Sequence, residues 1–130
     1  MKGQPILIVD DNAQNLKLAR VLLTRHGYEV HTAVDAEQAL LLLESIRPSI
    51  ILVDLQLPGM DGFELTRRLK ADPATKRIVV IAVTAYAMVG DDERAPAAGC
   101  DDYVAKPIDT KRLPRLIAHH LEHSAEHGLN

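Results

Sequence analysis

The feature that most constrains the fold is an alternation between two hydrophobic periods along the chain. Short apolar runs rich in β-branched residues occur at 6–9, 28–33, 50–53, 78–83 and 103–105. The stretches between them are longer and carry apolar residues at helical spacing. Five strands that alternate with helices predict a parallel sheet with helices on both faces, so that its central strands are apolar throughout.

Five helices are expected between and after these strands. An apolar stripe from Leu16 to Leu23 marks the first, which ends at Gly27. The others are expected over 36–46 behind the cap Asp35, over 62–71, over 91–98, and from the cap Asp109 to about His123. Because each crossover must be right-handed, we expect an α/β fold with a doubly wound, flavodoxin-like parallel sheet in the strand order 2-1-3-4-5.

The size and charge of the chain narrow the class of protein. Its 130 residues fit one domain, expected over 1–123, with a loosely held tail at 124–130. The net charge of −3 argues against a general affinity for nucleic acid. The single cysteine, Cys100, permits no internal disulfide, and the apolar run near the N-terminus is too short for a signal peptide or a membrane span. We therefore expect a cytoplasmic protein that binds neither nucleic acid nor membrane.

Polar residues follow four of the predicted strands at their carboxyl ends, where open α/β sheets bind ligands. They are Asp10-Asp11, Asp54, Thr84 and Lys106-Pro107. Three neighbouring carboxylates need a cation to remain ionised together, and oxygen ligands without His or Cys favour Mg²⁺. Phosphoryl transfer requires positioning and charge neutralisation, which a metal, a lysine and a hydroxyl supply, and an aspartate can be the nucleophile.

Over roughly residues 5–122 the chain resembles the response-regulator receiver (CheY-like) family of two-component systems. The matching segments are ILIVDDN at 6–12, IILVDLQLPGMDGFEL at 50–65, VIAVTA at 80–85 and GCDDYVAKPI at 99–108. The resemblance implies that Asp54 accepts the phosphoryl group. It also implies that Asp11 and Asp54 ligate Mg²⁺ (or Mn²⁺ in its place) together with the backbone carbonyl of Gln56, and that Asp10 acts mainly through water.

The resemblance assigns roles to the remaining residues of the rim. Thr84 and Lys106 would bind phosphoryl oxygens, and Pro107 would follow a cis peptide bond. Tyr103 lies at the position of the family's switch aromatic. Gln56 and Tyr86 occupy positions that tune the lifetime of the phosphoryl group, whose value cannot be carried over.

The chain shares one segment with a subgroup of the family and departs from the family's common pattern at one residue. The run AVTAYAMVGDDER at 82–94 is similar to that of DivK-like single-domain regulators of cell division and of the receivers of hybrid kinases. Pro96 departs from the common pattern because it lies inside the expected fourth helix, where proline shortens or kinks the element.

Several residues, taken singly, fit other interpretations. Asp11 or Asn12 could cap the first helix. A calcium loop starting at Asp10 lacks its glycine and its terminal glutamate, and a haloacid-dehalogenase-type hydrolase would require a second Asp at Asn12. Basic residues gather at 67–77, which is more typical of a solvated face than of a nucleic-acid site. Histidines at 119, 123 and 127 could line a metal-binding ridge if the last helix continues, although a frayed, solvated terminus is the favoured interpretation.

The resemblance implies a phosphorylation-driven binding module rather than an enzyme with a separate substrate. Its phosphodonor would be a histidine kinase or a histidine phosphotransfer protein. Phosphorylation would change the surface of the fourth helix, fifth strand and fifth helix, where a downstream protein partner binds, and the chain would be a monomer or a weak dimer. Two alternatives stay open: a phosphate sink that hydrolyses the phosphoryl group without output, and a receiver domain excised from a hybrid kinase.

Overall fold

Five parallel strands form the centre of the molecule. In the computed structural model, which describes residues 3–57, 59–84 and 99–128 and the side chains as far as residue 122, they are β1 (Pro5–Val9), β2 (Glu29–Ala33), β3 (Ile50–Asp54), β4 (Val79–Thr84) and β5 (Asp102–Ala105). The strand order is β2-β1-β3-β4-β5 and every pairing is parallel. The predicted sheet topology is confirmed.

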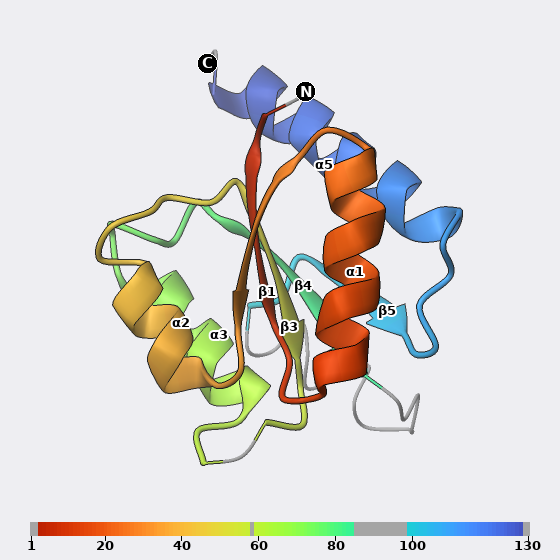
Figure 1. Ribbon diagram of the computed structural model, residues 1–130. Helices are drawn as coiled ribbons and strands as arrows, with labels where there is room; N and C mark the ends of the chain where they lie inside the picture. The colour runs from red at the N-terminus through yellow and green to blue at the C-terminus, as the bar shows by residue number, and fades with distance from the viewer. Residues whose placement is uncertain (1–2, 58, 85–98, 129–130) are drawn as a thin grey trace.

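Four helices are described, two on each face of the sheet (Figure 1). They are α1 (Ala13–Arg25), α2 (Ala36–Leu42), α3 (Gly62–Ala71) and α5 (Arg112–Gly128). α1 and α5 cover one face, and α2 and α3 cover the other. The helix expected over 91–98, with Pro96 inside it, lies outside the described residues.

The two faces of each central strand enter different cores. Ile6 and Ile8 of β1 pack with the buried side chains of α1 and α5, whereas Leu7 and Val9 pack with those of α2 and α3. The same alternation holds along β3, whose five residues are all buried. This two-sided burial explains why β1 and β3 are apolar along almost their whole length.

Short polar caps start the helices close to the carboxyl ends of the strands. The side-chain oxygen of Asn12 accepts hydrogen bonds from the backbone amides of Gln14 and Asn15. Asp35 caps α2 and Asp61 caps α3 in the same way. Asn12, rather than Asp11, therefore caps α1, which leaves the Asp11 carboxylate available at the rim.

Two helix ends differ from the prediction. α2 ends at Leu42 instead of residue 46, and the chain continues into turns in which the amides of Glu44 and Ser45 donate to carbonyl oxygens three residues back. α5 extends beyond His123 to Gly128, the first residue after that point that disfavours a helix. Within the described residues, no helix is both long and apolar enough to cross a membrane.

Candidate functional site

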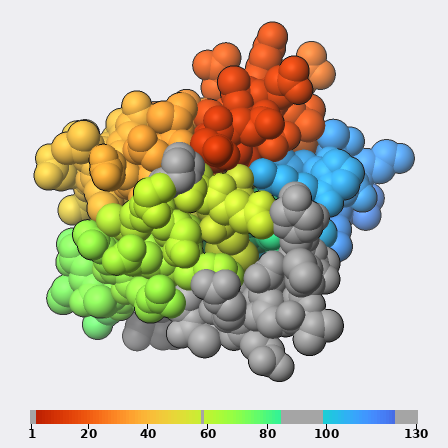
Figure 2. All heavy atoms as spheres, turned by 90° about the horizontal axis from the view of Figure 1, so that it is seen from below, coloured from red at the N-terminus to blue at the C-terminus, as the bar shows by residue number. Residues whose placement is uncertain are grey.

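Three loops meet at the carboxyl edge of the sheet. The segments that follow β1, β3 and β5 lie side by side when the molecule is seen from below (Figure 2), in red, yellow-green and blue respectively. Parallel strands bring these loops together because all of them end at the same edge. The predicted convergence of Asp10, Asp11, Asp54 and Lys106 is observed.

The carboxylates of Asp10, Asp11 and Asp54 form a compact cluster. One oxygen of each lies within 4.8 Å of the others. Asp10 and Asp54 are 4% and 5% exposed, whereas Asp11 is exposed. Two of the three charges are therefore removed from water and the third faces it, so the cluster is accessible from one side.

Lys106 supplies the positive charge that Asp10 and Asp54 share. Its Nζ lies 3.0 Å from Asp10 Oδ2 and 3.0 Å from Asp54 Oδ2. The backbone amide of Lys106 donates to the carbonyl oxygen of Thr84, which fixes the start of the loop after β5. Three carboxylates against one ammonium leave a local excess of negative charge.

Backbone amides orient the two buried carboxylates. Asp54 Oδ1 accepts from the amide of Gln56 at 2.9 Å, and Asp10 Oδ1 accepts from the amide of Asn12 at 2.8 Å. In each carboxylate the other oxygen, Oδ2, faces Lys106. Both groups are thus held in one rotamer before any ligand arrives, which is the preorganisation that phosphoryl transfer requires.

Electrostatics at Asp54 are dominated by burial. Burial raises the pKa of Asp54 above its ordinary value and the nearby Asp10 charge adds to the rise, although the Gln56 amide and the Lys106 ammonium act in the opposite direction. Burial by itself lowers the pKa of Lys106, but the hydrogen bonds to Asp54 and Asp10 and their charges outweigh it and raise that pKa. Lys106 is therefore charged at neutral pH. The Gln56 amide and the Lys106 ammonium only partly offset the cost of burying the negative charge of Asp54.

Gly62 is a residue of the site that the sequence reasoning did not single out. A Cβ placed on Gly62 would lie 2.5 Å from the carbonyl oxygen of Asp54 and 2.7 Å from Leu55 Cα. The first turn of α3 therefore packs directly on the backbone that carries Asp54. The signal in the sequence is a glycine directly after the cap Asp61, at a position where helices do not favour glycine.

The remaining predicted residues lie around the cluster with different degrees of exposure. Thr84 is fully buried at the end of β4, and Tyr103 is partly buried against the small cluster of Leu55, Phe63 and Ala82. The Lys106–Pro107 peptide bond is cis, as predicted. Gln56 is exposed, and Tyr86 lies outside the described residues.

The donor set fits a hard divalent cation. Among the described residues, the candidate side-chain ligands of the cluster are carboxylate oxygens, and one carboxylate is open to solvent, as a partly hydrated Mg²⁺ requires. A cation at this place would also compensate the excess charge left by Lys106. The residues present therefore fit the metal that the sequence suggested.

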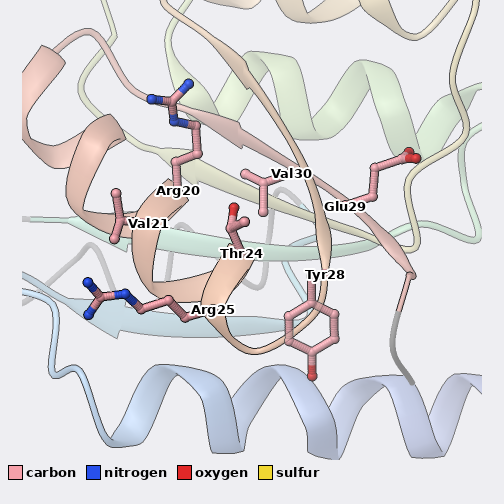
Figure 3. A pocket seen from close by; sticks show the side chains of 7 residues that line it. All are labelled: Arg20, Val21, Thr24, Arg25, Tyr28, Glu29 and Val30. Carbon is pink, nitrogen blue, oxygen red and sulfur yellow. The ribbon is translucent and has the colours of Figure 1, made fainter.

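A separate hollow lies away from the carboxylate cluster. It has a volume of about 560 Å³ and lies between the C-terminal half of α1 and the start of β2 (Figure 3). Arg20, Arg25 and Glu29 are its charged residues. Because β2 begins there, the hollow is at the amino edge of the sheet, opposite the carboxylate cluster.

Comparison with known proteins places this arrangement in a family. The family model of the response regulator receiver domain matches residues 6–118. The polar-differentiation response regulator DivK of Brucella anthropi is 44% identical over 116 residues, which are 89% of this chain and 94% of that protein.

Solved structures agree with this result. A CheY-like response regulator receiver domain protein from Methanospirillum hungatei JF-1 superposes with a TM-score of 0.90 at 30% identity, covering 97% of this chain and 99% of that one. The receiver domain of a sensor histidine kinase from Pseudomonas aeruginosa PAO1, with a magnesium ion coordinated in its active-site cleft, gives a TM-score of 0.85 at 38% identity. The shared portion is 92% of this chain and 98% of that one.

Proposed function

Because the chain belongs to the response regulator receiver family of two-component signalling, we propose that it is a DivK-like regulator that accepts a phosphoryl group on Asp54 with Mg²⁺ bound. The observation that carries this assignment is the position of the Asp54 carboxylate, which is buried, held by a backbone amide and paired with Lys106. It lies within a carboxylate cluster suited to a hard cation.

Transfer would proceed by in-line attack of an Asp54 oxygen on the phosphorus of a phosphohistidine. The new P–O bond forms as the P–N bond breaks, and the imidazole nitrogen leaves with the bonding electrons. Asp11 and Asp54, with the Gln56 carbonyl, would hold Mg²⁺, and Asp10 would reach it through water. When bound, the metal would neutralise charge that develops on the phosphoryl oxygens.

Lys106 would act on both sides of the reaction. Before transfer its ammonium compensates Asp10 and Asp54, at 3.0 Å from each. After transfer the same ammonium would pair with the phosphoryl group, which carries more negative charge than the carboxylate that it replaces. Thr84 would donate its hydroxyl to another phosphoryl oxygen.

The output would be a change in surface rather than a released product. Tyr103 is on β5, three residues before Lys106, and its partly buried ring packs on Leu55, Phe63 and Ala82. Movement of Thr84 toward the phosphoryl group would alter the space open to this ring, so that the surface around β5 and α5 changes for a protein partner. The donor would be a histidine kinase or a histidine phosphotransfer protein.

Phosphorylation by a small donor tests the assignment. Acetyl phosphate with Mg²⁺ should add one acid-labile phosphoryl group, measured by intact mass, and should add none in the presence of EDTA. Asp54→Asn should remain unmodified. An Asp54→Asn protein that is labelled as fast as the parent would show that the acceptor is another residue.

A further inference from the structure

A carboxylate–imidazole pair joins β5 to α5, away from the carboxylate cluster. Asp102 Oδ2 lies 2.7 Å from Nε2 of His120, which is on α5. The other oxygen, Oδ1, accepts from the backbone amide of Tyr103 at 2.7 Å. One side chain thus contacts both the helix and the backbone of the predicted switch residue.

The pair is partly shielded from water. The side chains of His120 and Asp102 are 16% and 34% exposed. A hydrogen bond in this environment keeps its geometry better than a surface ion pair, because fewer water molecules compete for either partner.

β5 is held at both of its ends. It is a strand of four residues at the edge of the sheet, and among the described residues it pairs with β4 alone. At its carboxyl end Lys106 binds Asp10 and Asp54, and at its amino end Asp102 binds His120. A change in the pairing of Lys106 therefore acts on a short strand whose other end is bonded to α5.

Docking of α5 on the sheet does not depend on this bond. Leu113, Ile117 and Leu121 are almost completely buried in the core that α5 shares with α1. The hydrogen bond lies beside that apolar contact and fixes how β5 and α5 sit against each other. This hydrogen bond can therefore transmit a small displacement of β5 to α5.

We propose that the Asp102–His120 hydrogen bond is the link that carries the phosphorylation signal from β5 to α5, with His120 as a positioning residue. The proposal rests on the proposed function, since it requires that a phosphoryl group at Asp54 alters the contacts of Lys106. Rearrangement at the Asp54 site displaces β5, changes the geometry at Asp102, and through His120 alters the exposed face of α5.

Nuclear magnetic resonance with beryllofluoride, a phosphoryl mimic, and Mg²⁺ tests the link in the unmodified chain. The imidazole resonances of His120 should shift when beryllofluoride is added, whereas those of His26, exposed at the end of α1, should not. An unchanged His120 signal, in a sample whose Asp54 and Lys106 amides do respond, would overturn the proposal and leave the proposed function intact. If those amides do not respond either, the proposed function fails and the link fails with it.

Substitutions separate signalling from a purely structural role. In His120→Leu the amides around Asp54 should still respond to beryllofluoride, and the shifts of residues 112–122 should fall to less than half of the parent values. His120→Gln retains a side-chain N–H donor and should recover most of that response, and the matched control His26→Leu should behave as the parent. Equal α5 shifts in His120→Leu and the parent, or no recovery in His120→Gln, would contradict the link.

Discussion

Two lysines form ion pairs of similar length but differ in what surrounds them. Lys106 binds Asp10 and Asp54 at 3.0 Å with side chains that are 15%, 6% and 6% exposed, and Lys70 binds Asp101 at 2.8 Å with side chains that are 22% and 39% exposed. Lys70 also donates to the carbonyl oxygens of Lys76 and Ile78, and Asp101 also accepts from the amide of Val80.

The difference lies in the balance of charge. Around Lys70 and Asp101 one cation meets one anion, and the remaining hydrogen-bonding capacity is used by backbone groups of fixed position. Around Lys106 one cation faces three carboxylates, two of them buried. The balanced pair ties α3 to the segment before β5, whereas the unbalanced cluster retains an affinity for further positive charge. We infer that excess charge, rather than the distance within an ion pair, distinguishes the reactive site from the structural one.

The largest expected effect is on binding of Mg²⁺. At about 100 times its dissociation constant, Mg²⁺ should raise the free energy of unfolding of the parent by about 2.7 kcal/mol. Asp11→Asn should require a higher Mg²⁺ concentration for the same gain, because a neutral amide is a poorer ligand for a hard cation. Urea unfolding in EDTA and in increasing Mg²⁺ measures both effects. Equal urea midpoints in EDTA and in Mg²⁺ would show that the folded protein does not bind the cation.

Loss of Lys106 should come next in size. In EDTA, Lys106→Ala should lower the free energy of unfolding by about 2 kcal/mol, since Asp10 and Asp54 would remain buried without their cation. Mg²⁺ should recover part of this loss and bind more tightly than to the parent, because the competing ammonium is absent. Isothermal titration calorimetry gives the affinity, and a weaker affinity in Lys106→Ala would contradict the charge-balance argument.

Asp54→Asn should stabilise the metal-free protein, by about 1 kcal/mol at neutral pH, because it removes one buried charge from the unbalanced cluster. Burial raises the pKa of Asp54, so the folded parent binds this proton more readily than the unfolded chain. The parent should therefore lose stability as the pH rises from the ordinary aspartate pKa to the raised one, and Asp54→Asn should lack this component. Urea unfolding at a series of pH values measures this difference. If the difference in free energy of unfolding between Asp54→Asn and the parent does not grow over this pH range, burial does not raise the pKa of Asp54.

The smallest effect is expected at the balanced pair. Lys70→Met should lower the free energy of unfolding by about 0.5 kcal/mol, as is usual for partly exposed ion pairs. It should leave Mg²⁺ affinity and the rate of labelling by acetyl phosphate unchanged, so it serves as the matched control for Lys106→Ala. A change in Mg²⁺ affinity as large as that of Lys106→Ala would mean that proximity of any lysine–carboxylate pair matters more than its charge balance.

The sequence predicted the sheet better than the helix ends. β3 is apolar along its whole length because both of its faces are buried, and such a strand leaves a strong local signal. The end of α2 is marked by turns in which the amides of Glu44 and Ser45 donate to carbonyl oxygens three residues back. Such contacts are specific to the folded chain, and hydrophobic periodicity does not report them.

The same contrast applies to the site. Asp10, Asp54 and Lys106 could be brought together from the sequence because each lies at the carboxyl end of a parallel strand. The bond between Asp102 and His120 could not be predicted, since the two residues are 18 positions apart on different elements and their approach depends on how α5 packs. The tight approach of Gly62 to the Asp54 backbone likewise requires coordinates.

Chemical mapping of the acceptor tests the central claim most directly. After acetyl phosphate and Mg²⁺ treatment, borohydride should reduce the acyl phosphate to an alcohol, which converts the modified aspartate to homoserine. Peptide mass spectrometry should then find homoserine at residue 54 and aspartate at residues 10 and 11. Homoserine at residue 10 or 11, with an unchanged Asp54, would contradict the account.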